Sequence, residues 1–207
     1  MAYLVLVRHG QSQWNEKGLW TGWKDIPLSS TGIEEARKAG ELLKDIHFNY
    51  AFTSDLQRAG QTTDEIIKAL GQTMPITKDK ALNEKDYGDM TGKNKWEVKK
   101  EVGDEEFMKI RRSWDYPVPG GESLKMVYER TIPYYQQHIL PLLKEGKNVL
   151  VSAHNNSLRA LVKYLENISD EDISKREMAT GEIYIYQIDQ DGKVIDKQTR
   201  ASRPNTA

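Results

Sequence analysis

The stretch Leu4-Val5-Leu6-Val7-Arg8-His9-Gly10 decides the fold of this chain. Four consecutive apolar residues, two of them β-branched, predict a buried strand of the kind found in parallel sheets. The strand ends in Arg-His-Gly, and open α/β sheets carry their binding sites at the carboxyl ends of their strands. Because Arg8 is a fixed positive charge, His9 is a poor metal ligand and is well placed to meet an anion. The first anion to consider is phosphate.

Composition narrows the possible functions. The 207 residues contain 30 basic and 31 acidic side chains, which give a net charge of -1. A chain with this balance is not expected to bind nucleic acid through bulk charge, so any anion site must be local. The absence of cysteine excludes disulfides, thiolate catalysis and thiolate-bound zinc.

Localisation is predicted from what the chain lacks. Met1-Ala2-Tyr3 leads directly into the first strand, without the charged and apolar regions of a signal peptide. No apolar run approaches the roughly 20 residues of a membrane span. We therefore expect a cytoplasmic protein without membrane contacts.

Short apolar runs alternate with helical patterns, which predicts an α/β fold. We expect one domain over residues 1–207, a three-layer sandwich in which helices flank a mainly parallel central sheet. Strands are predicted near 2–7, 50–53, 75–77 and 148–153, with an antiparallel edge formed by 183–188 and 194–197. Helices are predicted at about 31–46, 55–70 and 123–143, and a further one from Ser157.

Five details of these elements can be tested. Thr31-x-x-Glu34 and Ser54-x-x-Gln57 match capping boxes. Pro133 predicts an irregularity in its helix. The polar segment 83–121 is expected to form a lid or wall, and the tail 198–207 is expected to be mobile.

Three predicted strand ends carry groups suited to an anion. The first strand delivers Arg8 and His9, the second leads into the helix that contains Arg58, and a later one ends in His154. If the strands are parallel, these groups meet at one edge of the sheet, together with the positive ends of helix dipoles. Two imidazoles and two guanidiniums around one point suit a phosphoryl group in transfer. Each residue alone has a plainer interpretation, a structural histidine or a surface arginine.

The polar segment adds a carboxylate and further cations. Glu84 could exchange a proton with a substrate hydroxyl if its loop covers the site, or it could simply be solvated. Lys95 and the pair Arg111-Arg112 could bind a second anionic group of the substrate, such as a carboxylate. Their alternative is to be charges on a solvated helix face.

Six motifs resemble the histidine phosphatase superfamily and, within it, the cofactor-dependent phosphoglycerate mutases. The segments RHGQSQWN (8–15), TGWKDIPLSSTG (21–32) and TSDLQRAGQT (53–62) are similar to the blocks of that family, as are LNEKDYGDMTGKNK (82–95), RRSWD (111–115) and SAHNNSLRALVKYL (152–165). The RHG motif indicates the superfamily, whereas the TGW, NEKDYG, NK and RR elements are more specific to the mutases. The chain departs from the pattern at Gln11, where glutamate is usual, and at Asn155, where glycine is usual.

The resemblance implies a reaction and a set of roles. The chain would interconvert 3-phosphoglycerate and 2-phosphoglycerate, primed by 2,3-bisphosphoglycerate and without a metal. His9 would become phosphohistidine, Arg8, Arg58 and His154 would hold the phosphoryl oxygens, and Glu84 would be the general acid and base. The implied substrate-binding positions are Ser12, Asn15, Thr21, Gly22, Tyr87, Lys95, Arg111, Arg112, Asn155 and Asn156. The partners would be small phosphoglycerates and other copies of the chain in a homodimer or homotetramer.

Two alternatives remain at the level of sequence. A phosphomonoester phosphatase would use the same His9 chemistry with water as the final acceptor. A member that has lost activity and serves as a binding or regulatory module is supported only by the departures at Gln11 and Asn155. Retention of the five proposed catalytic residues argues against that module.

Overall fold

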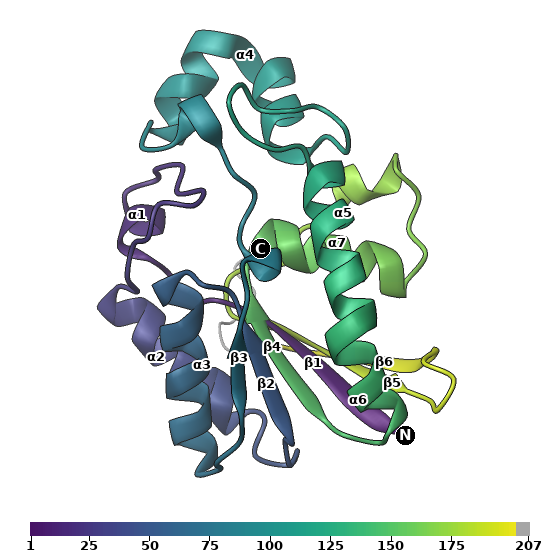
Figure 1. Cartoon of the computed structure of the whole chain (residues 1–207). Helices are drawn as coiled ribbons and strands as arrows, with labels where there is room; N and C mark the ends of the chain where they lie inside the picture. Colours follow the sequence, from purple (N-terminus) through teal and green to yellow (C-terminus); the bar gives the residue numbers. More distant parts are fainter. Residues whose placement is uncertain (202–207) are drawn as a thin grey trace.

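A mixed sheet forms the centre of the structure, a computed structural model that describes residues 1–201. Its six strands are ordered β3-β2-β4-β1-β5-β6 (Figure 1). The strands are β1 (Ala2–Arg8), β2 (Tyr50–Thr53), β3 (Ile76–Lys78), β4 (Val149–Ala153), β5 (Glu182–Ile188) and β6 (Val194–Ala201). The predicted mainly parallel sheet with an antiparallel edge is confirmed, because β1 to β4 pair in parallel and β5 and β6 are antiparallel.

The register of the central strands sets the position of the site. β4 pairs in parallel with β1 on one side and with β2 on the other. Arg8 lies opposite Ala153, and Thr53 lies opposite Ser152. The three carboxyl ends are therefore level, and the segments that follow them emerge at one edge of the sheet.

Helices cover both faces of this sheet, as the three-layer prediction requires (Figure 1). Val5, Val7 and Leu150 pack with residues of α2 and α3 on one face, whereas Leu6 and Val151 pack on the other with residues of α5, α7 and the segments between them. The helices are α1 (Gln13–Glu16), α2 (Ser30–Glu41), α3 (Gln57–Leu70), α4 (Lys95–Arg112), α5 (Leu124–Tyr134), α6 (Leu140–Lys144) and α7 (Asn155–Leu165). Short 3₁₀ turns are η1 (Lys80–Leu82), η2 (Gly88–Met90) and η4 (Asp172–Lys175), and η3 (Tyr135–Ile139) is a π-helical stretch.

Both predicted capping boxes are wrong. α2 begins at Ser30, and the side chain that caps it is that of Ser29, whose Oγ accepts from the amide of Gly32. α3 begins at Gln57 after Leu56, which has no capping side chain. The hydroxyl of Ser54 instead reaches His154, so a residue that matches a cap motif is used by the site.

The irregularity predicted at Pro133 is present. α5 ends at Tyr134, and the π-helical stretch η3 follows at once. Proline has no amide hydrogen and its ring crowds the preceding turn, which disrupts the regular helical hydrogen bonds. The predicted single helix 123–143 is therefore three consecutive segments.

The predicted mobile tail is wrong for its first residues. Residues 198–201 belong to β6 and pair with β5. Arg200 forms two hydrogen bonds with the carboxylate of Asp45, at 2.6 and 2.7 Å. Residues 202–207 of that prediction lie outside the described residues.

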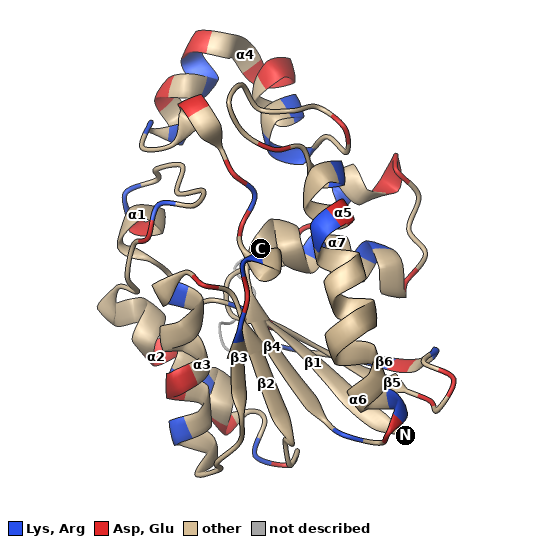
Figure 2. Ribbon diagram, in the orientation of Figure 1, with Lys and Arg blue, Asp and Glu red and all other residues tan. Residues whose placement is uncertain are grey.

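The segment predicted as a lid or wall contains α4, which stands apart from the sheet (Figure 1). Beneath it lies a small apolar cluster that includes Trp20, Tyr87, Phe107 and Ile110. Charged residues lie on the helices and the loops, whereas the central strands carry almost none (Figure 2). Gly103 has a φ of 80° and interrupts the helical geometry of α4.

Gly10 and Gly32 hold the first loop against α2. A Cβ on Gly10 would overlap the carbonyl of Gly32, and a Cβ on Gly32 would overlap the carbonyl of Gln11. The close approach at Gly10 is therefore made to the backbone of α2. The glycines allow the loop that carries His9 to pack directly on a helix.

We expect Gly32→Ala to lower the free energy of unfolding by about 3 kcal/mol, because its methyl group must displace backbone. Gly60→Ala in α3 is the matched control. Its Cβ would lie 3.5 Å from Lys78 Nζ, an ordinary contact, so helix propensity should stabilise the variant by up to about 1 kcal/mol. Urea unfolding of both variants tests this. A Gly32→Ala protein as stable as the parent would contradict the account.

Candidate active site

A pocket opens at the carboxyl edge of β1, β2 and β4. The residues that line it are Arg8, His9, Asn15, Trp20, Thr21, Gly22, Arg58, Glu84, Tyr87, Lys95, Arg111, Arg112, Asn155 and Glu177. All except Trp20 and Glu177 were predicted as site residues from the sequence. Segments far apart in the chain are brought together here because the parallel strands end at one level.

His9 is held in one orientation at the base of the pocket. Its Nδ1 lies 2.6 Å from the carbonyl oxygen of Gly10. A carbonyl can only accept, so Nδ1 carries the proton and Nε2 keeps its lone pair. Burial, followed by the charges of Arg58 and Arg8, holds the pKa of His9 well below its ordinary value. The ring is therefore a neutral imidazole with a free nucleophilic nitrogen.

Arg58 is fixed beside His9 by backbone carbonyls. Its guanidinium donates to the carbonyls of Gly22 and Lys24 at 2.8 and 3.0 Å. The residue is 1% exposed, which rules out the surface-arginine interpretation. Burial lowers the pKa of Arg58 to about 10, and the group stays charged at neutral pH. The TGW segment thus contributes by holding a cation as well as by lining the pocket.

Arg8 and His154 each present a buried nitrogen that has no hydrogen-bond partner among the described residues, Nε of Arg8 and Nδ1 of His154. The His154 ring lies 4.8 Å from that of His9, centroid to centroid, and its Nε2 lies 2.7 Å from Ser54 Oγ. Since Ser54 Oγ already accepts from the amide of Leu56, its proton can go to Nε2 of His154 and leave a proton on Nδ1. Unpaired buried donors are costly, and two beside one histidine indicate an anionic ligand.

Glu84 is held by one carboxylate oxygen. Its Oε1 accepts from the amides of Lys85 and Asn156 and from the Asn156 side chain, at 2.8 to 3.1 Å. Oε2 receives no hydrogen bond from residues 1–201, and the residue lines the pocket while being 8% exposed. The solvated interpretation of Glu84 is thus wrong, and one oxygen is left for a ligand.

Three predicted site residues do not line the pocket. Ser12 is fully buried, and its Oγ caps α1 by accepting from the amide of Asn15 at 3.1 Å. Asn156 is fully buried and binds both Glu84 and the Tyr87 hydroxyl. His154 is fully buried, with its ring beside that of His9. Ser12 and Asn156 support residues of the pocket, and their direct contact with substrate stays a prediction.

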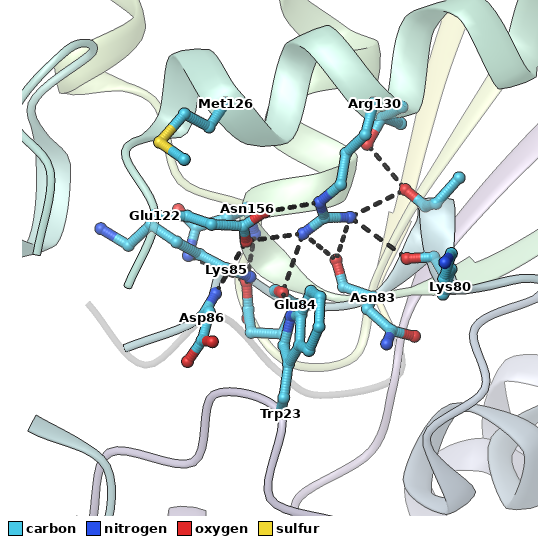
Figure 3. A network of polar contacts seen from close by, with 12 residues as sticks. Trp23, Lys80, Asn83, Glu84, Lys85, Asp86, Glu122, Met126, Arg130 and Asn156 are labelled. Atoms are coloured by element: carbon cyan, nitrogen blue, oxygen red, sulfur yellow. Dashed lines mark hydrogen bonds and ion pairs between the residues drawn. The ribbon is translucent and has the colours of Figure 1, made fainter. Parts of the chain in front are cut away.

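Arg130 of α5 holds the loop that carries Glu84 (Figure 3). It donates to the carbonyls of Ala81, Asn83 and Glu84 at 2.9 to 3.1 Å. It also forms a two-point ion pair with Glu122, both nitrogen–oxygen distances being 2.8–2.9 Å.

Glu122 extends this support to the other side of Glu84. Its Oε2 accepts from the amide of Asp86 at 2.9 Å. The indole of Trp23 donates to the carbonyl oxygen of Glu84 at 2.7 Å, the same oxygen that accepts from Arg130, and the Arg130 guanidinium lies 5.8 Å from the centre of the Trp23 ring (Figure 3). Sequence reasoning missed Arg130 and Glu122, because an arginine within a helical pattern carries no signal for the loop that it contacts.

Lys95, Arg111 and Arg112 form the outer wall of the pocket. Lys95 Nζ lies 5.5 Å from the centre of the Trp20 ring, a cation–π contact. Burial, then the charges of Arg111 and Arg8, lowers the pKa of Lys95 to about 8. A lysine with this pKa is mostly charged at neutral pH, and a bound anion would favour its charged form further.

The side chain of Gln11 binds Ser29 and is not part of the pocket lining. Its side-chain Oε1 accepts from Ser29 Oγ at 3.0 Å, and its backbone amide donates to the carboxylate of Glu35 at 2.8 Å. The departure from the family pattern at this position therefore leaves the groups around His9 in place.

Within residues 1–201 the structure shows no group of three or more histidine, aspartate or glutamate side chains arranged to hold a metal ion. In the same range, no helix is long and apolar enough to cross a membrane.

Comparison with known proteins agrees with this geometry. The sequence profile of the histidine phosphatase superfamily (branch 1) matches residues 4–200. The 2,3-bisphosphoglycerate-dependent phosphoglycerate mutase of Nitrobacter hamburgensis is 54% identical over 94% of this chain and 95% of that protein. The one from Parvibaculum lavamentivorans is 46% identical over 97% of each chain.

Solved structures share the fold over almost the whole chain. Bacillus stearothermophilus YhfR has a TM-score of 0.81 at 26% identity and covers 94% of each chain. A phosphoglycerate mutase from Bacillus anthracis has a TM-score of 0.73 at 25% identity and covers 97% of this chain and 92% of that one. On the superfamily match and the identity to these relatives, this chain belongs to branch 1 of the histidine phosphatase superfamily.

Proposed function

We propose that this protein interconverts 3-phosphoglycerate and 2-phosphoglycerate, with 2,3-bisphosphoglycerate as the phosphoryl primer. The observation that carries the proposal is the state of His9, a neutral imidazole whose Nδ1 donates to the carbonyl of Gly10 and whose Nε2 therefore keeps its lone pair. Relatives that share half of this sequence bear the name of a 2,3-bisphosphoglycerate-dependent mutase, which supports the same activity.

In the first step, Nε2 of His9 attacks the phosphorus of a phosphate ester. A nitrogen–phosphorus bond forms while the bond from phosphorus to the ester oxygen breaks. The equatorial oxygens of the transferring group would lie among the guanidiniums of Arg8 and Arg58 and Nδ1 of His154. Positive charge that is fixed in advance stabilises this transition state without reorganisation.

Glu84 donates and accepts the proton in the two transfer steps. As an acid it protonates the ester oxygen that leaves, and as a base it later removes a proton from the hydroxyl that attacks phosphohistidine. Its Oε1 is occupied by three donors, so Oε2 is the oxygen that exchanges the proton. Asn156 and Arg130 keep that oxygen in place.

The cations of the outer wall favour mutase activity over phosphatase activity. Lys95, Arg111 and Arg112 would bind the carboxylate of phosphoglycerate, while His9 exchanges the phosphoryl group with the oxygen on C2 or on C3. A bisphosphorylated intermediate that turns within the pocket would present its other phosphate to His9. A phosphatase needs no carboxylate site, and these three cations therefore favour the mutase over hydrolysis.

The remaining expectations stay predictions. They are metal-free catalysis, a single domain over residues 1–207, a cytoplasmic location and assembly as a homodimer or homotetramer. The substrate contacts proposed for Asn15, Thr21, Gly22, Tyr87 and Asn155 are supported by their place on the pocket wall.

One assay tests the reaction. Supplied with 3-phosphoglycerate, the protein should form 2-phosphoglycerate only when catalytic amounts of 2,3-bisphosphoglycerate are present, with little inorganic phosphate and no effect of EDTA. His9→Ala should lower the rate about 10⁴-fold or more and abolish acid-labile phosphate labelling. His47→Ala, which removes an exposed imidazole, is the control and should keep both.

Other outcomes of the same assay would reject the proposal. Release of phosphate without 2-phosphoglycerate would indicate a phosphatase. No turnover of any kind would favour the binding module. Labelling that persists in His9→Ala would place the nucleophile elsewhere.

Arg130→Lys tests the positioning of Glu84. A lysine keeps the charge but cannot bind several carbonyls and Glu122 at once. We expect the rate with phosphoglycerate to fall about 100-fold, the scale of general acid catalysis. The rate with para-nitrophenyl phosphate should change less than about threefold, because its leaving group needs no protonation.

Two comparison variants, Glu84→Gln and Arg37→Lys, serve as the reference and the control for this test. Glu84→Gln should show the same dependence on the leaving group as Arg130→Lys. Arg37→Lys, on an exposed arginine of α2, should leave both rates unchanged. An equal loss with both substrates in Arg130→Lys would show that Arg130 acts only through overall structure.

The burial of His9 and His154 predicts the pH dependence of stability. Both folded-state pKa values are held well below 6.5, chiefly by burial and then by Arg58. The unfolded chain therefore binds more protons below about pH 6.5, and stability must fall as pH falls. From pH 7.5 to 5.5, urea unfolding should show a loss of about 1 kcal/mol for each histidine. His9→Asn should remove about half of that dependence, and an unchanged slope would contradict it.

A further inference from the structure

Glu177 is an acidic residue in a pocket whose lining includes five arginine and lysine side chains, Arg8, Arg58, Lys95, Arg111 and Arg112. It lies between η4 and β5, and Glu84 is the other acidic residue that lines the pocket. Its side chain is 38% exposed, so it is neither buried in the core nor free in solvent. The mechanism above gives it no role.

The backbone around Glu177 is tied to the site. Arg8 donates to the carbonyl of Met178 at 2.7 Å. The amide of Met178 donates to Asn155 Oδ1 at 3.2 Å. Arg8, one of the cations beside His9, and Asn155 of the pocket lining thus hold the strap 176–178 against the pocket.

The carboxylate of Glu177 contacts both arginines of the outer wall. Oε2 accepts a hydrogen bond from Arg112, and Oε1 lies 3.7 Å from Arg111 Nη2. Burial opposes the charge of Glu177, but the hydrogen bond and charge of Arg112 prevail and lower the pKa of this carboxyl below its ordinary value. Glu177 is therefore a carboxylate at neutral pH.

The same two arginines are the proposed site for the carboxylate of the substrate, so this inference rests on the proposed function. We propose that Glu177 is a specificity-determining residue, an internal carboxylate that occupies Arg111 and Arg112 until the carboxylate of a phosphoglycerate displaces it. A phosphate ester without a carboxylate cannot make this exchange.

The structure allows such an exchange. The backbone is held at Met178, so rotation of the Glu177 side chain is enough to release the arginines. The side chain is already partly exposed, and the displaced carboxylate can be solvated. Because Glu177 must be displaced from Arg111 and Arg112, phosphoglycerate binds more weakly than it would to unpaired arginines. When no matching ligand is present, Glu177 keeps both arginines paired.

A matched pair of ligands tests the proposal. 3-Phosphoglycerate and glycerol 3-phosphate share the phosphate, and the second carries a hydroxymethyl group in place of the carboxylate. In Glu177→Gln, the Kd of 3-phosphoglycerate measured by calorimetry should fall about fivefold, the scale of one partly exposed ion pair. The Kd of glycerol 3-phosphate should not change. Glu171→Gln, which removes an exposed charge from the same segment, should leave both unchanged.

Two results would overturn the proposal. Unchanged or weaker binding of 3-phosphoglycerate would show that Glu177 does not compete for the arginines. Equal tightening of both ligands would show a general effect of net charge. These results are independent of the proposed function, whose failure appears as absence of 2-phosphoglycerate in the assay above.

Limited proteolysis of the unaltered protein tests the proposal without relying on the folding of a variant. Lys175 and Arg176 are exposed next to Glu177 and are sites for trypsin. Saturating 3-phosphoglycerate should speed cleavage there, because the strap loses its contact with Arg112. Glycerol 3-phosphate should have no such effect. Equal or slower cleavage with 3-phosphoglycerate would count against displacement.

Discussion

Parallel hydrogen bonding of β4 with both β1 and β2 is the constraint on which the rest of the structure depends. It places the ends of three strands level, so His9, His154 and the helix that carries Arg58 meet at one edge of the sheet. A shift in this register would separate these groups or turn them toward a helix-covered face. The chemistry of the pocket is thus a consequence of strand pairing, and the glycine contact between the first loop and α2 keeps the edge in place.

The pocket concentrates positive charge, and the fold has to stabilise it before any ligand arrives. Backbone carbonyls do much of this, since Gly22 and Lys24 accept from Arg58 and Met178 accepts from Arg8. The acidic side chain of Glu177 pairs with the arginines at the outer wall. Among the described residues, Nε of Arg8 and Nδ1 of His154 are buried without a hydrogen-bond partner, and they leave donors for an anion beside His9.

Much of this arrangement could be predicted from the order of residues. Apolar runs predicted the strands, and the polar residues that follow them predicted the site edge, because side chains at parallel strand ends must converge. The capping boxes failed for two reasons: α2 begins before Thr31 and is capped by Ser29, and the hydroxyl of Ser54 binds His154, which is remote in sequence. Arg130 could not be predicted, since its importance comes from loop carbonyls almost fifty residues away in sequence.

The sequence by itself determined the α/β class, the family and the residues that surround His9, because these depend on local apolar patterns and on motifs of adjacent residues. Only the tertiary structure decided how those residues are held. It showed that Asn156 supports Glu84, that Arg130 clamps the loop and that Glu177 reaches the arginine pair. The physical reason is that hydrogen bonds and ion pairs depend on distances between side chains that are remote in sequence, and packing alone fixes those distances.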